Sequence, residues 1–383
     1  MERTKQEGLN EVVEKNIQRK LDKGMLNVQS ATNRLIEEGK IAKDFIFEVG
    51  TTRKGIDTNI TFIPDVGSKV GAQFRMPTGI ENFTFHPHAI KQVAEKLQIP
   101  TTYLTGLLYA SDDWKKTLGY EIMNTHNGWL ERNKVLVRAV GTEVRAVLSD
   151  QYRRLDSEMI FGTHIEEIFA NKGALSDGFM DDTRIMIESI RPKPIEIHTT
   201  LNGIILVAFG TRLDSSDYGD GALNLRSFIL NGSCLNGAVR QSVLRAVHLG
   251  AKLPDNIGLS QKTYELDSQA TASAIRDLTK NLYSDANIQD RILEIQAASD
   301  APIDPVGAIK QLFMTGKLFK GETDRIGEIL MRNDPRQGVQ GEATLWKLAQ
   351  GITAFANTEE VDTRRKLELQ EVAGDLFNKL GKS

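Results

Sequence analysis

Hydrophobic and polar positions change their spacing twice along this chain. Near the N-terminus, Val13, Ile17 and Leu21 recur at helical spacing with Glu and Lys between them, which predicts a helix. From Phe45 the apolar residues come in short runs broken by Gly and Pro, a pattern typical of strands. After Pro254 the helical spacing returns nearly to the end. The three predicted regions are a helical appendage at 1–44, an α+β core domain at 45–255 and a helical C-terminal region at 256–383.

The middle region is predicted to build a central antiparallel sheet with packed helices. Its clearest hairpin pairs residues 134–140 with residues 143–148, because both runs are rich in valine and a Gly-Thr turn joins them. A helix at 157–170 follows, capped by Asp156 or Ser157. Further strands are predicted at 184–190, 203–209 and 223–230. With the helical ends, this pattern gives an α+β fold class.

The single cysteine, Cys234, lies in a predicted elbow. Asn231-Gly232 and Asn236-Gly237 flank it, and both dipeptides tolerate positive φ, so we expect two sharp turns there. Nothing in the sequence marks the thiol as a nucleophile, and we interpret it as a packed small side chain. The predicted structural turn residues are Gly232, Cys234, Asn236 and Gly237.

A helix with a basic face is predicted directly after this elbow. Arg240, Arg245 and His248 are interspersed there with valine and leucine at helical spacing. Such a face can present cations to phosphates, and a solvated helix surface is the alternative interpretation.

Composition and missing motifs exclude several classes of protein. The net charge is −3, so binding to nucleic acid would need a local basic groove. The chain has no phosphate-binding Gly-rich loop, no His-Glu-x-x-His helix and no Gly-x-Ser-x-Gly elbow. Its one cysteine forms neither an internal disulfide nor a cysteine-based zinc site. From these missing motifs we expect no cofactor and no metal. No apolar run is long enough to span a membrane and the N-terminus is charged, so we expect a cytoplasmic protein.

Two further clusters have structural interpretations. His86-Pro87-His88 could supply two imidazoles to a metal, but the sequence favours the start of a helix. Asp214, Asp217 and Asp220 lack the spacing of a calcium loop, and they favour a turn.

Basic and aromatic residues at strand ends are the strongest functional candidates. They would form a cationic groove with a stacking surface if the sheet placed them on one side, and single-stranded nucleic acid would suit that groove. The alternative is that the arginines pair with Glu143, Asp150, Asp156 and Glu158 in surface networks. The candidates are Arg138, Arg145, Tyr152, Arg153, Arg154, Arg226, Arg240, Arg245 and His248.

Three segments resemble signatures of a family of phage- and plasmid-like proteins, known mainly as a domain of unknown function. They are Ser149-Asp150-Gln151-Tyr152-Arg153, residues 215–221 with Arg226 and the Cys234-Leu235-Asn236-Gly237 elbow, and Thr344-Leu345-Trp346 with Gly351-Ile352-Thr353. Their order matches the family, and the resemblance spans residues 120–380. The chain departs from the family at Leu235, where a Ser or Thr is expected. The resemblance brings no established activity.

The sequence therefore predicts a phage- or plasmid-encoded protein that binds nucleic acid. Single-stranded DNA binding or annealing during recombination, in a homo-oligomer and without catalysis, fits best. The first alternative is a protein that modulates a host factor through protein contacts. The second is an enzyme acting on nucleotides or nucleic acids with Asp217, Asp220 or His248.

Overall fold

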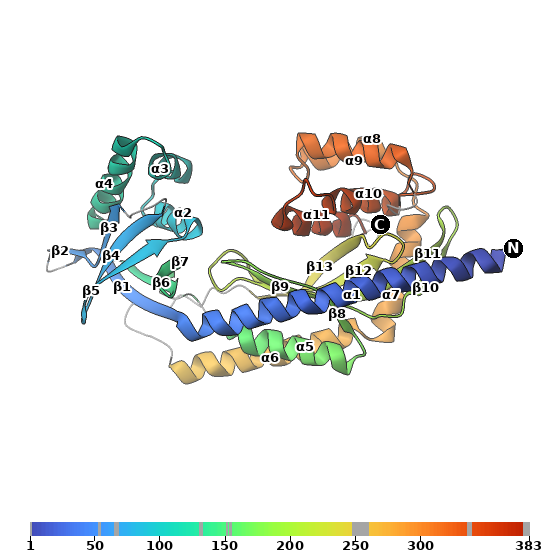
Figure 1. Cartoon of the computed structure of the whole chain (residues 1–383), viewed down its shortest axis with the longest axis horizontal. Coiled ribbons are helices and arrows are strands. Elements are labelled where there is room, and N and C mark those ends of the chain that lie inside the picture. Colours follow the sequence, from blue (N-terminus) through green and yellow to red (C-terminus); the bar gives the residue numbers. More distant parts are fainter. Residues whose placement is uncertain are drawn as a thin grey trace.

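The structure is a computed structural model, and it describes residues 2–52, 55–64, 69–129, 133–150, 152, 155–246, 260–334 and 339–377. Its strands form two sheets, and the long helix α1 (Glu2–Ile41) runs along the second sheet and leads directly into the first (Figure 1). In the described part of the chain, no helix is both long and apolar enough to cross a membrane.

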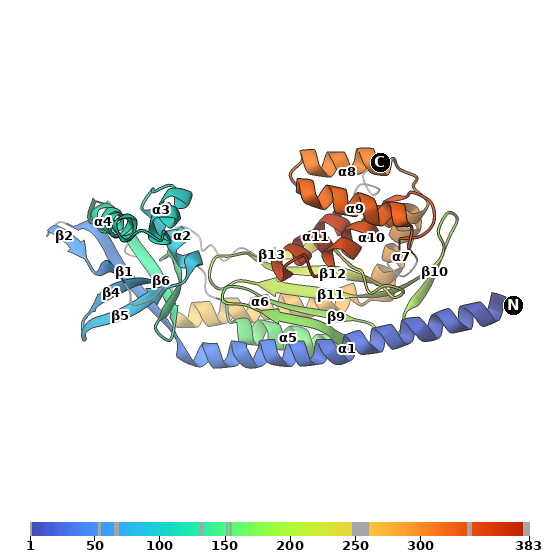
Figure 2. The ribbon, with the colours of Figure 1, turned by 45° about the horizontal axis from the view of Figure 1, so that its top comes forward.

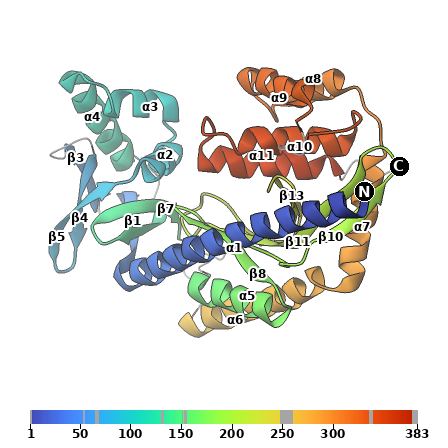
Figure 3. The same ribbon diagram turned by 45° about the vertical axis from the view of Figure 1, so that its right-hand side comes forward.

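The first sheet and its helices follow α1. The elements are β1 (Ala42–Thr52), β2 (Gly55–Thr58), β3 (Ile60–Pro64), β4 (Val70–Met76), β5 (Gly79–Phe85), α2 (Pro87–Lys96), α3 (Thr101–Leu108), α4 (Asp113–Trp129), β6 (Asn133–Val140) and β7 (Glu143–Ser149). The strand order is β2-β1-β6-β7-β5-β4-β3, and only β5 and β7 pair in parallel. Helices α2, α3 and α4 lie together beside this sheet (Figure 3), and a core rich in phenylalanine fills the space between them.

The second sheet and the C-terminal helices make up the rest of the described chain. The elements are α5 (Ser157–Ala170), β8 (Ala174–Met180), β9 (Ile185–Ile190), β10 (Ile195–Thr199), β11 (Gly203–Ser215), β12 (Leu223–Asn231), β13 (Gly237–Ala246), α6 (Gln261–Leu282), α7 (Asp285–Ser299), α8 (Pro305–Met314), α9 (Lys320–Arg332), α10 (Leu345–Ala356) and α11 (Thr363–Asp375). The order β13-β12-β11-β9-β8 is antiparallel throughout, and β10 also pairs with β11.

Alternating residues of β11 show how helices cover both faces of this sheet. Val207 and Phe209 join a core with α7 to α11, whereas Leu206 and Ala208 pack with residues of α1. Leu213, four positions after Phe209 and therefore on the same face of β11, packs with α5 and α6. The sheet is therefore buried on both faces, which explains its nearly continuous apolar strands.

The α+β class, the N-terminal helix and the helical C-terminal region are confirmed. The predicted hairpin is β6–β7 with Gly141 at φ 61° in its turn, and the Asp156 side chain caps α5 by accepting from the Met159 amide. The predicted strands divide between two sheets, with the hairpin in the first and the other three in the second. Helix α4 was not expected from the sequence.

The predicted basic helix after the elbow is wrong. Residues 237–246 form strand β13, which pairs with β12 from Leu230↔Gly237 to Leu223↔Ala246. Ala238 and Val239 are both buried, on opposite faces, against different cores. A short apolar run buried on both sides has no period that separates strand from helix, so pairing along β12 decided the conformation.

The predicted positive φ at Gly232 and Gly237 is also wrong. The left-handed residue of the elbow is Leu235, at φ 58°. Glycine is needed at the other two positions for space. A Cβ atom on Gly237 would lie 2.5 Å from the Phe228 ring, and one on Gly232 would lie 2.5 Å from Val13 of α1.

Candidate functional site

The two sheets meet where loops of the second sheet reach the first sheet and the end of α1. In the loop between β11 and β12, the Asp217 carbonyl accepts from Arg138 Nη1 of β6 at 2.6 Å. The next carbonyl, of Tyr218, accepts from Gln92 of α2 at 2.8 Å. Tyr152 also contributes, since its hydroxyl donates to the Ser216 carbonyl at 3.1 Å. These backbone contacts fix the loop against the first sheet.

Short polar side chains shape the two loops from within. Between β8 and β9, Asp181 Oδ1 accepts from the amides of Thr183 and Arg184, both at 2.8 Å. In the second loop, Ser216 Oγ accepts from the amides of Tyr218 and Asp220. Such side-chain to backbone bonds are typical of turns, so the turn predicted around Asp217 and Asp220 is confirmed. Asp214, the third residue of that predicted cluster, lies instead in strand β11.

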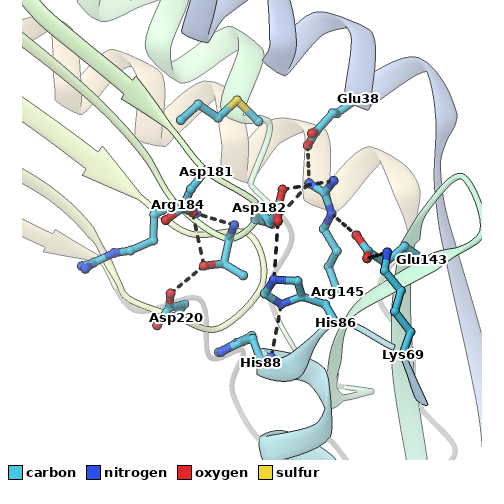
Figure 4. A network of polar contacts seen from close by, with 12 residues as sticks. Glu38, Lys69, His86, His88, Glu143, Arg145, Asp181, Asp182, Arg184 and Asp220 are labelled. Carbon is cyan, nitrogen blue, oxygen red and sulfur yellow. Dashed lines mark hydrogen bonds and ion pairs between the residues drawn. The ribbon is translucent and has the colours of Figure 1, made fainter. Parts of the chain in front are cut away.

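Arg145 of β7 is the centre of an ion-pair network at the junction (Figure 4). Its guanidinium lies 2.7 Å from Glu38 of α1, 3.4 Å from Glu143 and 3.5 Å from Asp182. Arg34 of α1 donates to the same Asp182 carboxylate at 2.5 Å. The pKa of Asp182 is lowered: burial alone would raise it, but the hydrogen bond from Arg34 and the charge of Arg145 outweigh burial. This network joins α1 to both sheets.

The C-terminal helices reach the same junction through Arg364 of α11. Its guanidinium lies 2.7 Å from Asp181 and 2.9 Å from Asp220. Thr183 Oγ1 donates to Asp220 at 2.6 Å and so links the two loops directly. Five parts of the chain are therefore held together at the junction, mainly by charged side chains: α1, β7, the two loops and α11.

A pocket of about 400 Å³ lies within this junction. Pockets of such size, at the boundary between structural units, are where proteins commonly hold small ligands. Most of its polar lining is charged or hydroxylated. Those lining residues are Glu38, Asp44, Arg138, Asp181, Thr183, Arg184, Ser215, Asp217 and Tyr218.

Several of the charged lining residues are already paired. Arg138 binds Asp44 through two hydrogen bonds of 2.9 and 3.2 Å. Glu38 pairs with Arg145, and Asp181 with Arg364. Three of the four lining carboxylates are thus neutralised by the protein itself.

Three lining groups keep free binding capacity. Within the described part of the chain, the Arg184 guanidinium and the Tyr218 hydroxyl have no hydrogen-bond or ion-pair partner, and the Arg184 side chain points away from the Arg145 network (Figure 4). Asp217 Oδ2 accepts from Ser157 at 2.5 Å, but its buried Oδ1 has no partner. Burial raises the pKa of Tyr218 to about 12, so its hydroxyl keeps its proton at neutral pH. The pocket therefore offers a cation, a carboxylate oxygen and a phenol.

The structure places the two His residues of the His-Pro-His motif at the start of α2, as the sequence favoured. His86 is the N-cap, and its Nδ1 accepts from the His88 amide at 3.2 Å. Across the residues with described positions, no three His, Cys, Asp or Glu side chains are grouped closely enough to hold a metal ion.

The structure divides the predicted nucleic-acid-binding residues between two places. Arg138, Arg145 and Tyr152 gather at the junction, where the arginines are paired and the tyrosine ring is buried. Of the acidic partners suggested by the sequence, Glu143 does pair with Arg145.

The remaining arginines lie on the second sheet. Arg226 pairs with Glu371 of α11, and Arg240 pairs with Glu294 of α7 at 2.8 Å, while Arg245 is exposed. Because β13 is a strand, these side chains do not form one helical face. Three other candidates, Arg153, Arg154 and His248, lie outside the described residues.

The elbow residues contact helix α10 and form no site of their own. Asn231 donates to Gln350 Oε1 at 3.0 Å, and Asn236 donates to the Gln350 carbonyl at 3.3 Å. Cys234 is half-buried, and its thiol lies 3.8 Å from the same Oε1. Burial raises the pKa of the Cys234 thiol to about 12, so little thiolate exists at neutral pH.

Sequence reasoning missed Arg184, Tyr218 and Arg364. Tyr218 lies within the turn that the sequence marks at Asp217 and Asp220, and Arg184 follows the Asp181-Asp182 pair by two positions. Arg364 carries no such signal, since only the packing of α11 brings it to the junction.

A comparison with protein-family models found no match, and comparisons with curated proteins and with solved structures found none either. The resemblance to the phage- and plasmid-like family stays a prediction.

Proposed function

We propose that this protein binds single-stranded nucleic acid and holds one unstacked nucleotide in the junction pocket. The observation that carries the proposal is a pocket of about 400 Å³ whose lining includes three groups with an unpaired polar atom. A nucleotide needs a cation for its phosphate, a hydrogen-bond acceptor for an exocyclic amine and an aromatic surface for its base. Arg184, Asp217 and Tyr218 supply these three chemistries.

This proposal replaces the continuous arginine groove with a local site. The arginines Arg138, Arg145, Arg226 and Arg240 are neutralised by carboxylates within the protein, so they favour a role in fixing the junction and the second sheet. A single base can enter a pocket only when it is unpaired, which favours single strands over duplex. Within the predicted phage or plasmid setting, such binding would serve strand annealing by a homo-oligomer in a bacterial cytoplasm.

The test is titration of a fluorescent single-stranded oligonucleotide at low salt, followed by anisotropy. Arg184→Ala should weaken binding about tenfold, because a charge-assisted bond to phosphate is lost. It should also reduce the slope of log affinity against log salt by about 0.7, the value for one phosphate contact on a single strand. Tyr218→Leu should weaken binding without changing the salt slope, because it removes stacking and no charge.

Arg276→Ala is the matched control, since Arg276 is an exposed arginine on α6, away from the pocket. It should leave affinity and slope unchanged. The proposal fails if the wild-type protein binds no single-stranded oligonucleotide, or if Arg184→Ala and Arg276→Ala behave alike. Equal affinity for a duplex of the same sequence would also reject insertion of an unstacked base.

A further inference from the structure

A cluster of charged side chains surrounds the buried pair of Glu188 and Arg212 in the second sheet. These two residues lie directly opposite each other on β9 and β11, and their charged groups are 2.6 Å apart. Lys20 of α1 reaches Glu188, and Gln370 of α11 accepts from Arg212. Strands β9 and β11 lie between α1 and α11 in the view of Figure 2. Both helices therefore border the same charged pair.

Lys366 of α11 adds a further cation to this cluster. It precedes Gln370 by four positions, so the two side chains lie on the same face of the helix. Lys366 is half-buried, and within the described part of the chain its ammonium has no hydrogen-bond or ion-pair partner. This cation therefore has no counter-ion of its own.

The two carboxylates of the cluster are already engaged by other cations. Glu188 lies 3.3 Å from Lys20 through one oxygen and 2.6 Å from Arg212 through the other. Asp177 lies 3.9 Å from Lys20 and also accepts from Asn27 at 2.8 Å. Three cations thus share two carboxylates, and one positive charge is not compensated within the cluster.

The pKa of Lys366 reflects this excess of positive charge. Burial lowers the pKa, the charges of Lys20 and Arg212 also lower it, and the opposing charges of Asp177 and Glu188 do not restore it. Arg212 is itself incompletely satisfied, because it is 2% exposed and its Nε and Nη1 have no partner. The cluster is therefore suited to an anion rather than to a cation or an apolar group.

We propose that Lys20 and Lys366 bind a phosphate group between α1 and α11, with the charge of Arg212 behind them. A phosphate accepts charge-assisted hydrogen bonds from several donors at once and brings the negative charge that the cluster lacks. Two sources share this chemistry: the backbone of a nucleic-acid strand and a small phosphate compound. The lining of the junction pocket includes none of these three residues, so the two sites are separate.

The experiment is urea denaturation of the full-length protein in inorganic phosphate or in chloride at equal ionic strength. A ligand that binds only the folded state shifts unfolding by mass action. Phosphate at ten times its dissociation constant should therefore lower the unfolding equilibrium constant about elevenfold relative to chloride. The shift should saturate with phosphate, which a general salt effect does not. Lys366→Gln should weaken phosphate binding about tenfold or more, and it should fold normally because Lys366 has no partner to lose.

A second arm of the experiment distinguishes the two sources of phosphate with a single-stranded oligonucleotide. If the group belongs to a strand, Lys366→Gln should reduce the slope of log affinity against log salt by about 0.7. An unchanged slope, with phosphate binding lost, assigns the site to a small phosphate compound.

Lys280→Gln is the matched control, because Lys280 is an exposed lysine on α6. It should keep the saturable shift of the wild-type protein. The proposal is overturned if phosphate stabilises the wild-type protein no more than chloride, if the shift does not saturate, or if Lys366→Gln and Lys280→Gln behave alike. None of these outcomes depends on Arg184→Ala, so this site can fail while the junction pocket stands, and the reverse.

Discussion

A buried ion pair between β9 and β11 should dominate the response of the second sheet to mutation. Glu188 and Arg212 are each 2% exposed, and their charged groups lie 2.6 Å apart. Lys20 of α1 lies 3.3 Å from the other Glu188 oxygen. Arg212 also binds Gln370 of α11, while its Nε and Nη1 have no partner. Glu188 is therefore the carboxylate that compensates two cations in the centre of the sheet.

Glu188→Gln should lower the free energy of unfolding by about 3–5 kcal/mol, because it leaves Arg212 buried without a counter-charge. The double variant Glu188→Leu with Arg212→Met should lose much less, since it removes both charges and keeps apolar volume. Urea denaturation followed by circular dichroism measures these differences. Glu360→Gln is the control: Glu360 forms an exposed pair with Arg325, and its removal should leave the denaturation midpoint unchanged.

The same pair predicts a pH dependence. Burial alone would raise the pKa of Glu188, but the charges of Lys20 and Arg212 outweigh it and the pKa is lowered. The unfolded chain therefore binds the proton at a higher pH than the folded protein. The stabilisation is fully present above the unfolded pKa of about 4.3 and is lost as pH falls through the folded pKa. A Glu188→Gln protein within about 1 kcal/mol of wild type at neutral pH, or with an unchanged acid transition, would refute this reasoning.

Two further predictions concern the elbow. Gly237→Val should destabilise the protein by about 1–3 kcal/mol through overpacking, because its Cβ would lie 2.5 Å from the Phe228 ring. Gly39→Ala is the control, because a Cβ at Gly39 would meet open space. Equal stability of the two variants in urea would contradict the predicted clash with Phe228. Cys234 should react slowly with a disulfide reagent at pH 8 and rapidly in urea, because burial raises its thiol pKa to about 12. Fast labelling of the native protein would instead indicate an accessible thiolate.

Local sequence patterns were sufficient for much of the fold. The β6–β7 hairpin has valine runs around a Gly-Thr turn, and α5 has Asp156 as its N-cap, so each element is specified by residues close to one another in the chain. The same applies to the turn around Asp217 and Asp220, where the Ser216 hydroxyl accepts from neighbouring amides. These interactions join residues that are close in sequence, so the sequence shows them directly.

Residues 237–246 show where local patterns were insufficient. Their spacing fits a basic helix. In the structure they instead pair with the edge of β12, and α11 packs on the resulting strand β13. Strand pairing and burial on both faces therefore determined their conformation. The partners of the arginines were decided in the same way. Arg145 pairs with Glu38 and Arg226 with Glu371, across more than 100 positions of sequence in each case.

The sequence by itself determined the α+β class, the helical ends, the hairpin and the turns, since these depend on periodicity and on side chains near the backbone groups they bind. Tertiary structure alone decided the division into two sheets, the position of Arg364 and the pocket at the junction. The physical reason is that charge compensation and burial depend on which distant segments pack together. Arg184 forms no ion pair within the described chain, and the neighbouring carboxylates Asp181 and Asp220 pair with Arg364 instead.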